Sequence, residues 1–366
     1  MKQVPFGRAT GCRVIAEAGT GHGADLARAL ELVDAAADAG ADCVKFQVVF
    51  AEELIHPLTG AVALPGGSVD LYRSFQAVER DADFYLRIKE RAVERGILFL
   101  ATAFGIRSAR LLRDIGAPAL KIASPELNHF PLLREAAGYG LPLVLSSGVS
   151  TLGDIERAVE CAGESTALLL HCVTAYPAPE QDYNLRVLQP LAVLLGVPTG
   201  VSDHSLDPEL VPTVAAAAGA AAVEKHFTLS RQGGALDDPI ALEPPQLAAM
   251  VAALRALEGR PDALDLVRAR YGSERVEAVL GSGRKRLAAS ELGNYGTTNR
   301  SLHALTALAA GTVLSAANVA ILRTEKNLRP GLGPEHLEIV LGRVVVRPVD
   351  AGAGIVWDDL MSPRAG

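Results

Sequence analysis

Short apolar segments alternate with longer amphipathic ones through residues 13–228 of the chain. Eight of these segments have the length and composition of buried strands, and a helix-like stretch with apolar residues at a helical period follows most of them. The predicted strands are residues 13–19, 41–47, 97–103, 119–126, 141–148, 166–173, 198–204 and 221–228. Eight successive strand–helix units predict an α/β fold in which the strands close into a (β/α)8 TIM barrel.

Two regions depart from this alternation. Residues 51–81 form a long insertion after the second predicted strand, and such a loop in a compact domain is usually functional or mobile. A lid over the barrel mouth and a surface loop without a role both fit it. From residue 299 short β-like runs alternate with turn signals, at 300–304, 320–322 and 343–346. We therefore expect a barrel domain over 1–285, a linker over 286–298 and a small β-rich domain over 299–366.

Composition narrows the class of protein. Hydrophobic residues make up 49% of the chain and charged residues 21%, as expected for a globular protein with a large core. A net charge of −7 argues against nucleic acid or an anionic membrane as a partner. No apolar run reaches the roughly 18–20 residues of a membrane span, and none of signal-peptide length precedes the first strand. The four cysteines show no CxxC spacing. We expect a cytoplasmic enzyme that acts on small molecules.

Polar residues gather where the predicted strands end. The carboxyl ends of barrel strands meet at one mouth, where TIM-barrel active sites lie. Because polar groups are costly to bury unless they are paired, these residues predict one shared polar pocket. They are Glu17, Lys45, Gln47, Thr102, Lys121, Ser124, Glu126, Ser146, Ser147, His171, Thr174, Tyr176, Ser202, Asp203, His204, Glu224, Lys225 and His226.

Two histidines of this set, His204 and His226, end consecutive predicted strands. Neighbouring strands lie about 4.8 Å apart, so two imidazoles there can meet one metal ion. A pair of hydrogen-bonded histidines without a metal fits the spacing equally well. His22, His129 and His303 are weaker candidates.

Three lysines, Lys45, Lys121 and Lys225, lie at the predicted mouth, where an unpaired ammonium is expensive to bury. They either bind phosphate and carboxylate groups as fixed charges, or one of them forms a Schiff base with a carbonyl substrate. The neighbouring hydroxyls favour the first reading, because lysines and hydroxyls together form an anion site. Lys225 could instead pair with Glu224.

Four carboxylates complete the candidate chemistry: Glu17, Glu126, Asp203 and Asp237. Glu17 and Glu126 could orient a polyol or activate water. Asp203 precedes His204, and adjacent strand residues face opposite sides, so Asp203 could form a structural salt bridge instead.

Seven blocks occur in one order along the chain: IAEAGTGHGADL at 15–26, GADCVKFQ at 40–47, LKIASPELNHFPLL at 120–133, LPLVLSSGVSTLGDI at 141–155, LLLHCVTAYPAPEQDYNL at 168–185, GVSDHS at 200–205 and VEKHFTLS at 223–230. Together they resemble the sialic acid synthase family, the nonulosonic acid synthases that condense phosphoenolpyruvate with an N-acetylated hexose. The tail, NRSLHALTALAAGTVLSAANV at 299–319 with LRPGLGP at 328–334, is similar to the family's antifreeze-like (SAF) domain, a β-clip.

The resemblance implies a transferase that joins phosphoenolpyruvate to a mannosamine-type sugar and releases phosphate. It implies that His204 and His226 hold Mn2+ or Mg2+, and that the catalytic residues are Glu17, Lys45, Glu126, His204 and His226. It assigns phosphoenolpyruvate to Thr102, Lys121, Ser124, Ser146 and Ser202. It assigns the sugar to Lys45, Gln47, Thr174, Tyr176, Asp237 and Arg300. A domain-swapped homodimer is implied, in which Arg300 of the partner subunit reaches the sugar's N-acetyl group.

Some positions depart from the family pattern and bear on the sugar. Thr174 stands where a sialic acid synthase often has Asn, and GGALDDP leaves either Asp237 or Asp238 for the sugar-site role. N-acetylmannosamine and diacetamido-trideoxyhexoses are both candidates. Two rival functions stay open at this point. One is a metal-independent Schiff-base aldolase that uses Lys121 or Lys45, and the other is a non-enzymatic carbohydrate- or ice-binding protein.

Overall fold

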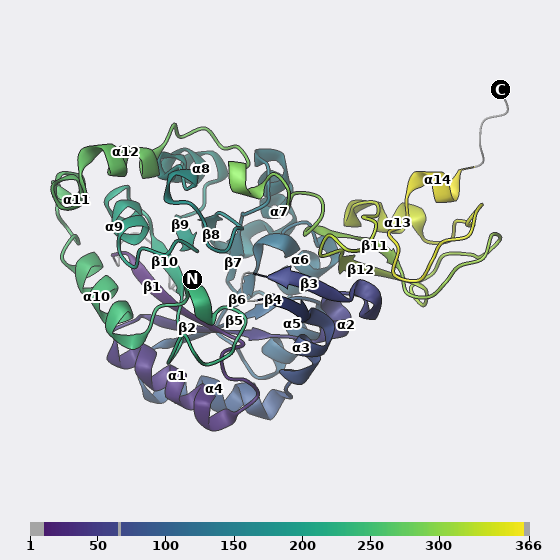
Figure 1. Ribbon diagram of the computed structural model, residues 1–366, viewed down its shortest axis with the longest axis horizontal. Helices are drawn as coiled ribbons and strands as arrows, with labels where there is room; N and C mark the ends of the chain where they lie inside the picture. The colour runs from purple at the N-terminus through teal and green to yellow at the C-terminus, as the bar shows by residue number, and fades with distance from the viewer. Residues whose placement is uncertain (1–10, 65–66, 362–366) are drawn as a thin grey trace.

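A closed eight-stranded parallel barrel forms the body of the molecule in the computed structural model, which describes residues 11–64 and 67–361 (Figure 1). The order around the barrel is β1-β10-β9-β8-β7-β6-β5-β2. These strands are β1 (Arg13–Gly19), β2 (Cys43–Val48), β5 (Leu98–Ala103), β6 (Leu120–Ile122), β7 (Leu143–Ser146), β8 (Thr166–Cys172), β9 (Thr199–Asp203) and β10 (Ala222–His226). The predicted TIM barrel is confirmed, although β6 and β7 are shorter than expected.

Helices surround the barrel, as Figure 1 shows. They are α1 (Leu26–Asp38), α4 (Ala82–Glu94), α5 (Ile106–Asp114), α6 (Phe130–Ala137), α7 (Leu152–Ala162), α8 (Leu188–Leu195), α9 (Leu210–Ala217), α10 (Pro244–Arg255), α11 (Ala263–Tyr271) and α12 (Ser273–Leu280). In α1 the N-cap Asp25 accepts the Ala27 N–H, and an apolar stripe that includes Leu32 and Val33 is buried. Such a stripe facing the strands is how an amphipathic helix joins a core.

The barrel interior changes character along its axis because strand side chains alternate with a period of two. Ile15 belongs to the apolar cluster inside the barrel, together with Leu100 and Val144. Glu17, two residues further along β1, shares the face of Ile15 and pairs in register with Lys45 and His226 on either side. The apolar floor therefore gives way to charged residues at the carboxyl ends of the strands.

The insertion after β2 is structured. It comprises α2 (Ala51–Leu54), the antiparallel hairpin of β3 (Ala61–Leu64) and β4 (Gly67–Asp70), and α3 (Leu71–Ala77). Residues 65 and 66 lie outside the described part. Leu54, Val62 and Phe75 line the cavity at the barrel mouth. The insertion thus forms an apolar wall of that cavity and is more than a surface loop.

The C-terminal region packs around its own small core of residues such as Leu302, Val345 and Ile355. It contains the antiparallel pair β11 (Arg300–Ala304) and β12 (Val319–Arg323), with α13 (Leu337–Val340) and α14 (Trp357–Leu360). The predicted run 343–346 contributes only an isolated bridge. The region lies beside α2 and the β3–β4 hairpin (Figure 1), and the Asn327 side chain donates to the carbonyls of Thr59 and Ala61.

Within residues 11–64 and 67–361 no helix is long and apolar enough to cross a bilayer.

Four buried histidines serve the fold and lie outside the mouth cavity. Burial lowers the pKa of His22 and His303 to about 4, and that of His129 and His171 to about 3. Each accepts or shares local hydrogen bonds, as when His129 Nδ1 caps α6 by accepting the Leu132 N–H. The weaker metal candidates His22, His129 and His303 are thus structural.

These histidines predict that the protein loses stability in mild acid. The unfolded chain takes up protons near pH 6.5, whereas the folded chain does so only near pH 3–4, so the free energy of unfolding falls as the pH drops through this window. Four such groups give a slope of up to about 5 kcal/mol per pH unit. Urea unfolding between pH 7.5 and 4.5 measures it. Replacing buried His171 by Asn should reduce the slope, and replacing partly exposed His336 by Gln should not. A stability that is constant from pH 7 to 5 would contradict this.

Candidate active site

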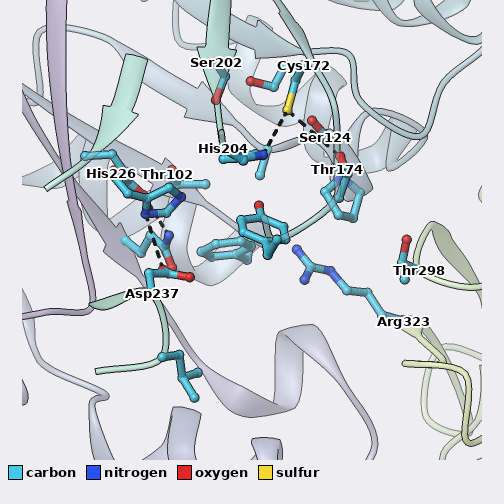
Figure 2. Close-up of a pocket in the computed structure, with 18 of the residues that line it drawn as sticks. Thr102, Ser124, Cys172, Thr174, Ser202, His204, His226, Asp237, Thr298 and Arg323 are labelled. Atoms are coloured by element: carbon cyan, nitrogen blue, oxygen red, sulfur yellow. Dashed lines mark hydrogen bonds and ion pairs between the residues drawn. The ribbon is translucent and has the colours of Figure 1, made fainter. Parts of the chain in front are cut away.

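A cavity of about 380 Å³ opens at the carboxyl ends of the barrel strands. Thirteen of the predicted site residues line it, and they come from every strand of the barrel or from the loop that follows it. They are Glu17, Lys45, Gln47, Thr102, Lys121, Ser124, Ser146, Thr174, Tyr176, Ser202, His204, His226 and Asp237. Figure 2 shows ten of the lining residues by name, projecting into a common space. The predicted convergence of strand ends is therefore observed for most of these residues. Those that do not line the cavity are Glu126, Ser147, His171, Asp203, Lys225 and Arg300.

Lys45 is the most tightly paired cation of the cavity floor. Its Nζ lies 2.8 Å from Glu17 Oε2, 3.6 Å from Glu224 Oε2 and 3.2 Å from Thr102 Oγ1. Burial alone lowers the pKa of Lys45, but the attraction of Glu17 and Glu224 outweighs burial and raises the pKa. Gln47 Nε2 donates to the other oxygen of Glu17 at 2.7 Å, which fixes that carboxylate. Lys45 is thus a permanent positive charge.

Lys121 is less well neutralised. Its Nζ donates to Ser146 Oγ at 2.6 Å, and its nearest carboxylate oxygen, Glu224 Oε1, is 3.8 Å away. Burial lowers the pKa of Lys121, and Glu224 does not offset this. A cation with a hydroxyl beside it and a distant counter-charge gains most from a bound anion.

Glu224 is a central residue of the floor, which the sequence placed among the polar strand ends without assigning it a catalytic or binding role. Burial alone raises its pKa, but Lys121 and Lys45 outweigh burial and lower the pKa to about 2, and Ser202 Oγ donates to it at 2.9 Å. It therefore stays ionised as the shared partner of two buried lysines. The inward direction of Glu224 can be read from the sequence, because Glu224 and His226 are two residues apart on one strand and must share a face.

The predicted position of Lys225 at the barrel mouth is wrong. It belongs to β10, between Glu224 and His226, and therefore points to the outside of the barrel. Its ammonium pairs with Asp203 and donates to the carbonyls of Ser205 and Asp207, at 2.9 and 3.0 Å. Lys225 takes no part in the cavity, and its partner is Asp203 and not Glu224. The structural salt bridge considered for Asp203 is the observed one.

Two imidazoles and a tyrosine form the upper part of the cavity. The His204 and His226 rings have centroids 5.4 Å apart, and Tyr176 stacks on His204 at 4.3 Å. Cys172 Sγ, a residue missed from the sequence, lies 3.8 Å from His204 Nδ1 (Figure 2). Burial alone lowers the pKa of His204, but Cys172 outweighs burial and raises it to about 9. Burial lowers the pKa of His226, and Asp237 offsets this only in part.

The donor set suits a divalent metal that is held by two histidines. His204 Nδ1 lies 2.8 Å from the Val173 carbonyl, which can only accept, so Nδ1 carries the proton and Nε2 keeps its lone pair for a ligand. Among the described residues no cluster of three or more His, Cys, Asp or Glu side chains is arranged to hold a metal ion. A metal here would keep several coordination positions for substrate and water, as an open catalytic site does.

Asp237, and not Asp238, faces the cavity. Asp237 Oδ2 lies 3.6 Å from His226 Nδ1, and Figure 2 shows the two side chains directed at each other. Asp238 is buried and accepts the backbone N–H of Ala235 at 2.8 Å, which shapes the loop. Of the two aspartates in the GGALDDP segment, Asp237 is therefore the one that lies at the cavity.

Glu126 and Arg300 lie outside the cavity lining of the single chain. They form a buried ion pair at 3.0 Å beside the cavity, and the Arg300 side chain also donates to the carbonyls of Phe104 and Leu54. Arg300 is thus held within its own chain and does not line the cavity. Arg323, which also contacts Glu126 at 2.6 Å, does line the cavity (Figure 2). No sequence signal indicated Arg323, because it comes from the other end of the chain.

Comparison with known proteins identifies the family of the chain. The NeuB family model matches residues 32–261, and the SAF-domain model matches residues 299–361. The chain belongs to the NeuB family. It is 33% identical over 354 residues to the spore coat polysaccharide biosynthesis protein SpsE of Bacillus subtilis, with 95% of this chain and 93% of SpsE covered. It is 32% identical to an N,N'-diacetyllegionaminic acid synthase of Legionella pneumophila, with 97% and 96% covered.

The solved structures extend the likeness to three dimensions. The crystal structure of SpsE has a TM-score of 0.79 and 32% identity, with 96% of each chain covered. The N-acetylneuraminic acid synthetase of Leptospira borgpetersenii, solved with citrate, has a TM-score of 0.60 and 35% identity, with 78% of this chain and 90% of that chain covered. The predicted family and the predicted enzyme class, a transferase-type synthase, are confirmed.

The two arginines of the C-terminal region should differ when they are removed. Arg300→Met deletes a fully buried guanidinium and leaves Glu126 and two carbonyls with fewer partners, so we expect a loss of about 3–5 kcal/mol in the free energy of unfolding. Arg323→Met, whose side chain reaches the cavity, should cost less. Chemical unfolding of both variants measures this. The reverse order, or an Arg300→Met variant as stable as the unsubstituted protein, would contradict the in-chain position of Arg300.

Proposed function

We propose that this enzyme condenses phosphoenolpyruvate with an open-chain N-acetylated hexose of the mannosamine type, giving a nonulosonic acid and phosphate. The observation that carries the proposal is that one cavity is lined both by lysines with hydroxyl residues and by a pair of histidines. The named activity of the Legionella relative, the synthesis of N,N'-diacetyllegionaminic acid, supports this substrate class.

The floor suits the phosphate and carboxylate of phosphoenolpyruvate. Lys121 donates to Ser146, and the hydroxyl residues Ser124 and Ser202 line the same cavity. A bound dianion would supply the negative charge that Lys121 lacks and would raise the pKa of its ammonium. These donors would then stabilise the charge that develops on the departing phosphate.

The remaining walls suit a sugar with both polar and apolar groups. Tyr176, Gln47 and Asp237 offer hydrogen-bonding groups near the histidines. Leu54, Val62 and Phe75 offer an apolar surface that an acetamido methyl or a deoxy carbon can contact. Arg323 reaches the cavity from β12 and is the cation best placed to donate to an acyl oxygen of the acceptor.

The chemistry follows from these positions. C3 of phosphoenolpyruvate forms a bond to the aldehyde carbon of the sugar, water adds at C2, and the C2–O bond breaks to release phosphate. Glu17 is buried between Lys45 and Gln47 and adjoins His226 across the strand pair, so it can orient the water and accept its proton. Lys45 stays charged and holds Glu17 in place.

A divalent ion, Mn2+ or Mg2+, would be held by His204 and His226 and would supply Lewis acidity to the aldehyde oxygen.

A homodimer and a cytoplasmic location belong to the proposal as well. Within one chain, Arg323 of the C-terminal region lines the cavity beside residues of the barrel.

Phosphate release tests the proposal directly. With Mn2+ and a panel of N-acetylated and diacetamido mannose-type sugars, we expect phosphate to be released from phosphoenolpyruvate only when a suitable sugar is present. EDTA should abolish the release, and added Mn2+ should restore it. Lys121→Met should lower the rate by about 100-fold or more, while Lys89→Met, on an outer helix, should have no effect.

The rival aldolase gives the opposite pattern. A Schiff-base enzyme would keep its activity in EDTA and would be trapped covalently by borohydride in the presence of its carbonyl substrate. Either result would contradict the proposed mechanism.

A further inference from the structure

The segment between the barrel and the C-terminal region crosses the barrel mouth. Residues 285–299, here termed the strap, lead from α12 past the barrel to β11 (Figure 1). The strap passes two loops beside the site, the loop that follows Ser146 at the end of β7 and the loop after β8 with Thr174. Its residues Asn294 and Thr298 line the cavity themselves.

Side chains of the strap satisfy the backbone of both loops. Glu291 Oε1 accepts the N–H groups of Val149 and Thr174, at 2.7 and 2.8 Å. Asn299 Nδ2 donates to the Val149 carbonyl at 3.1 Å, and Asn294 Nδ2 donates to the Thr174 carbonyl at 2.8 Å. Both polar backbone groups of each loop residue are therefore bonded to the strap. Buried backbone groups need such partners, and here no neighbouring strand supplies them.

The loop after β7 needs to be held. Val149 has a φ of 43°, and a β-branched side chain adopts that conformation only where its surroundings impose it. The Gly148 N–H donates to Ser124 Oγ at 3.0 Å, and a Cβ on Gly148 would overlap Thr174 Oγ1. The two loops and Ser124 thus pack directly together, so a shift of Val149 or Thr174 moves the hydroxyls that face the cavity.

Glu291 is the residue on which this arrangement centres. Its side chain is buried, with 1% of the residue exposed, and one of its oxygens bonds both loops. It touches Val149 and Thr174 through their backbones and does not line the cavity. We propose that Glu291 is a positioning residue, which holds the loops after β7 and β8 in the arrangement that binds phosphoenolpyruvate. The identity of this ligand rests on the proposed function.

Two substitutions of Glu291 distinguish the effect of its hydrogen bonds to the loops from the effect of its negative charge. Glu291→Gln keeps Oε1 for both loop N–H groups and alters only the oxygen that accepts the Ala288 N–H at 3.2 Å. Glu291→Ala removes both loop bonds. In calorimetric titrations of the full chain with phosphoenolpyruvate, we expect Glu291→Ala to weaken binding by about 10- to 100-fold. Glu291→Gln should bind within about threefold of the unsubstituted protein.

Asp42→Ala is a matched control. Asp42 is a half-buried carboxylate that accepts the backbone N–H of Val14 at 2.7 Å, directly before β2 and so at the opposite end of the barrel. It should lower the melting temperature without changing the affinity for phosphoenolpyruvate. Amide hydrogen exchange adds a second readout, because Val149 and Thr174 should lose protection in Glu291→Ala and keep it in the other two variants.

The outcomes are distinct. A folded Glu291→Ala variant with unchanged affinity and unchanged exchange would overturn the proposal, and so would an equal loss of affinity in Asp42→Ala. If Glu291→Ala does not fold, the pair Asn294→Ala and Asn299→Ala should show the same effects to a smaller degree, because it removes the two donors to the loops, together with the acceptor of the Gly296 N–H. If the unsubstituted protein binds no phosphoenolpyruvate, the proposed function fails, while the amide exchange still decides whether Glu291 holds the loops.

Discussion

A balance of buried charge at the barrel mouth is the interaction on which the site depends. Lys45 and Lys121 are almost fully buried, and Glu224 lies between them as their common carboxylate. Ammonium groups are tolerated in such surroundings only when they are paired. The pairing is uneven, because Lys45 has Glu17 as well, whereas Lys121 has only the more distant oxygen of Glu224. This deficit of negative charge marks the place where an anionic substrate is best accommodated.

The barrel does not complete this site by itself. The insertion after β2 supplies an apolar wall, β12 supplies Arg323, and residues 285–299 hold the two loops beside the lysines. Glu126 joins these parts, because it pairs with both Arg300 and Arg323 from the C-terminal region. The strands carry the charged floor, while the connecting segments and the C-terminal region carry the walls, as is usual in TIM barrels.

Strand alternation explains both what was predictable and what was missed at the floor. A period of two places Ile15 and Glu17 on one face, and the same rule places Glu224 beside His226 inside the barrel. It also directs Lys225 outward, where it pairs with Asp203. Glu224 and Lys225 were both expected at the mouth because both stand at the end of one predicted strand. Counting alternate residues keeps Glu224 in the pocket and excludes Lys225.

The sequence by itself determined the barrel, the mouth at its strand ends and most of the polar residues there, because each of these follows from local periodicity and from chain order. Only the tertiary structure decided which parts of the C-terminal region complete the cavity. Glu291 lies 142 positions from Val149, and Arg300 lies 174 positions from Glu126. Contacts between residues so far apart depend on how the two regions pack together. That packing leaves no periodic trace in either segment, so Arg323 and Glu291 could be found only in three dimensions.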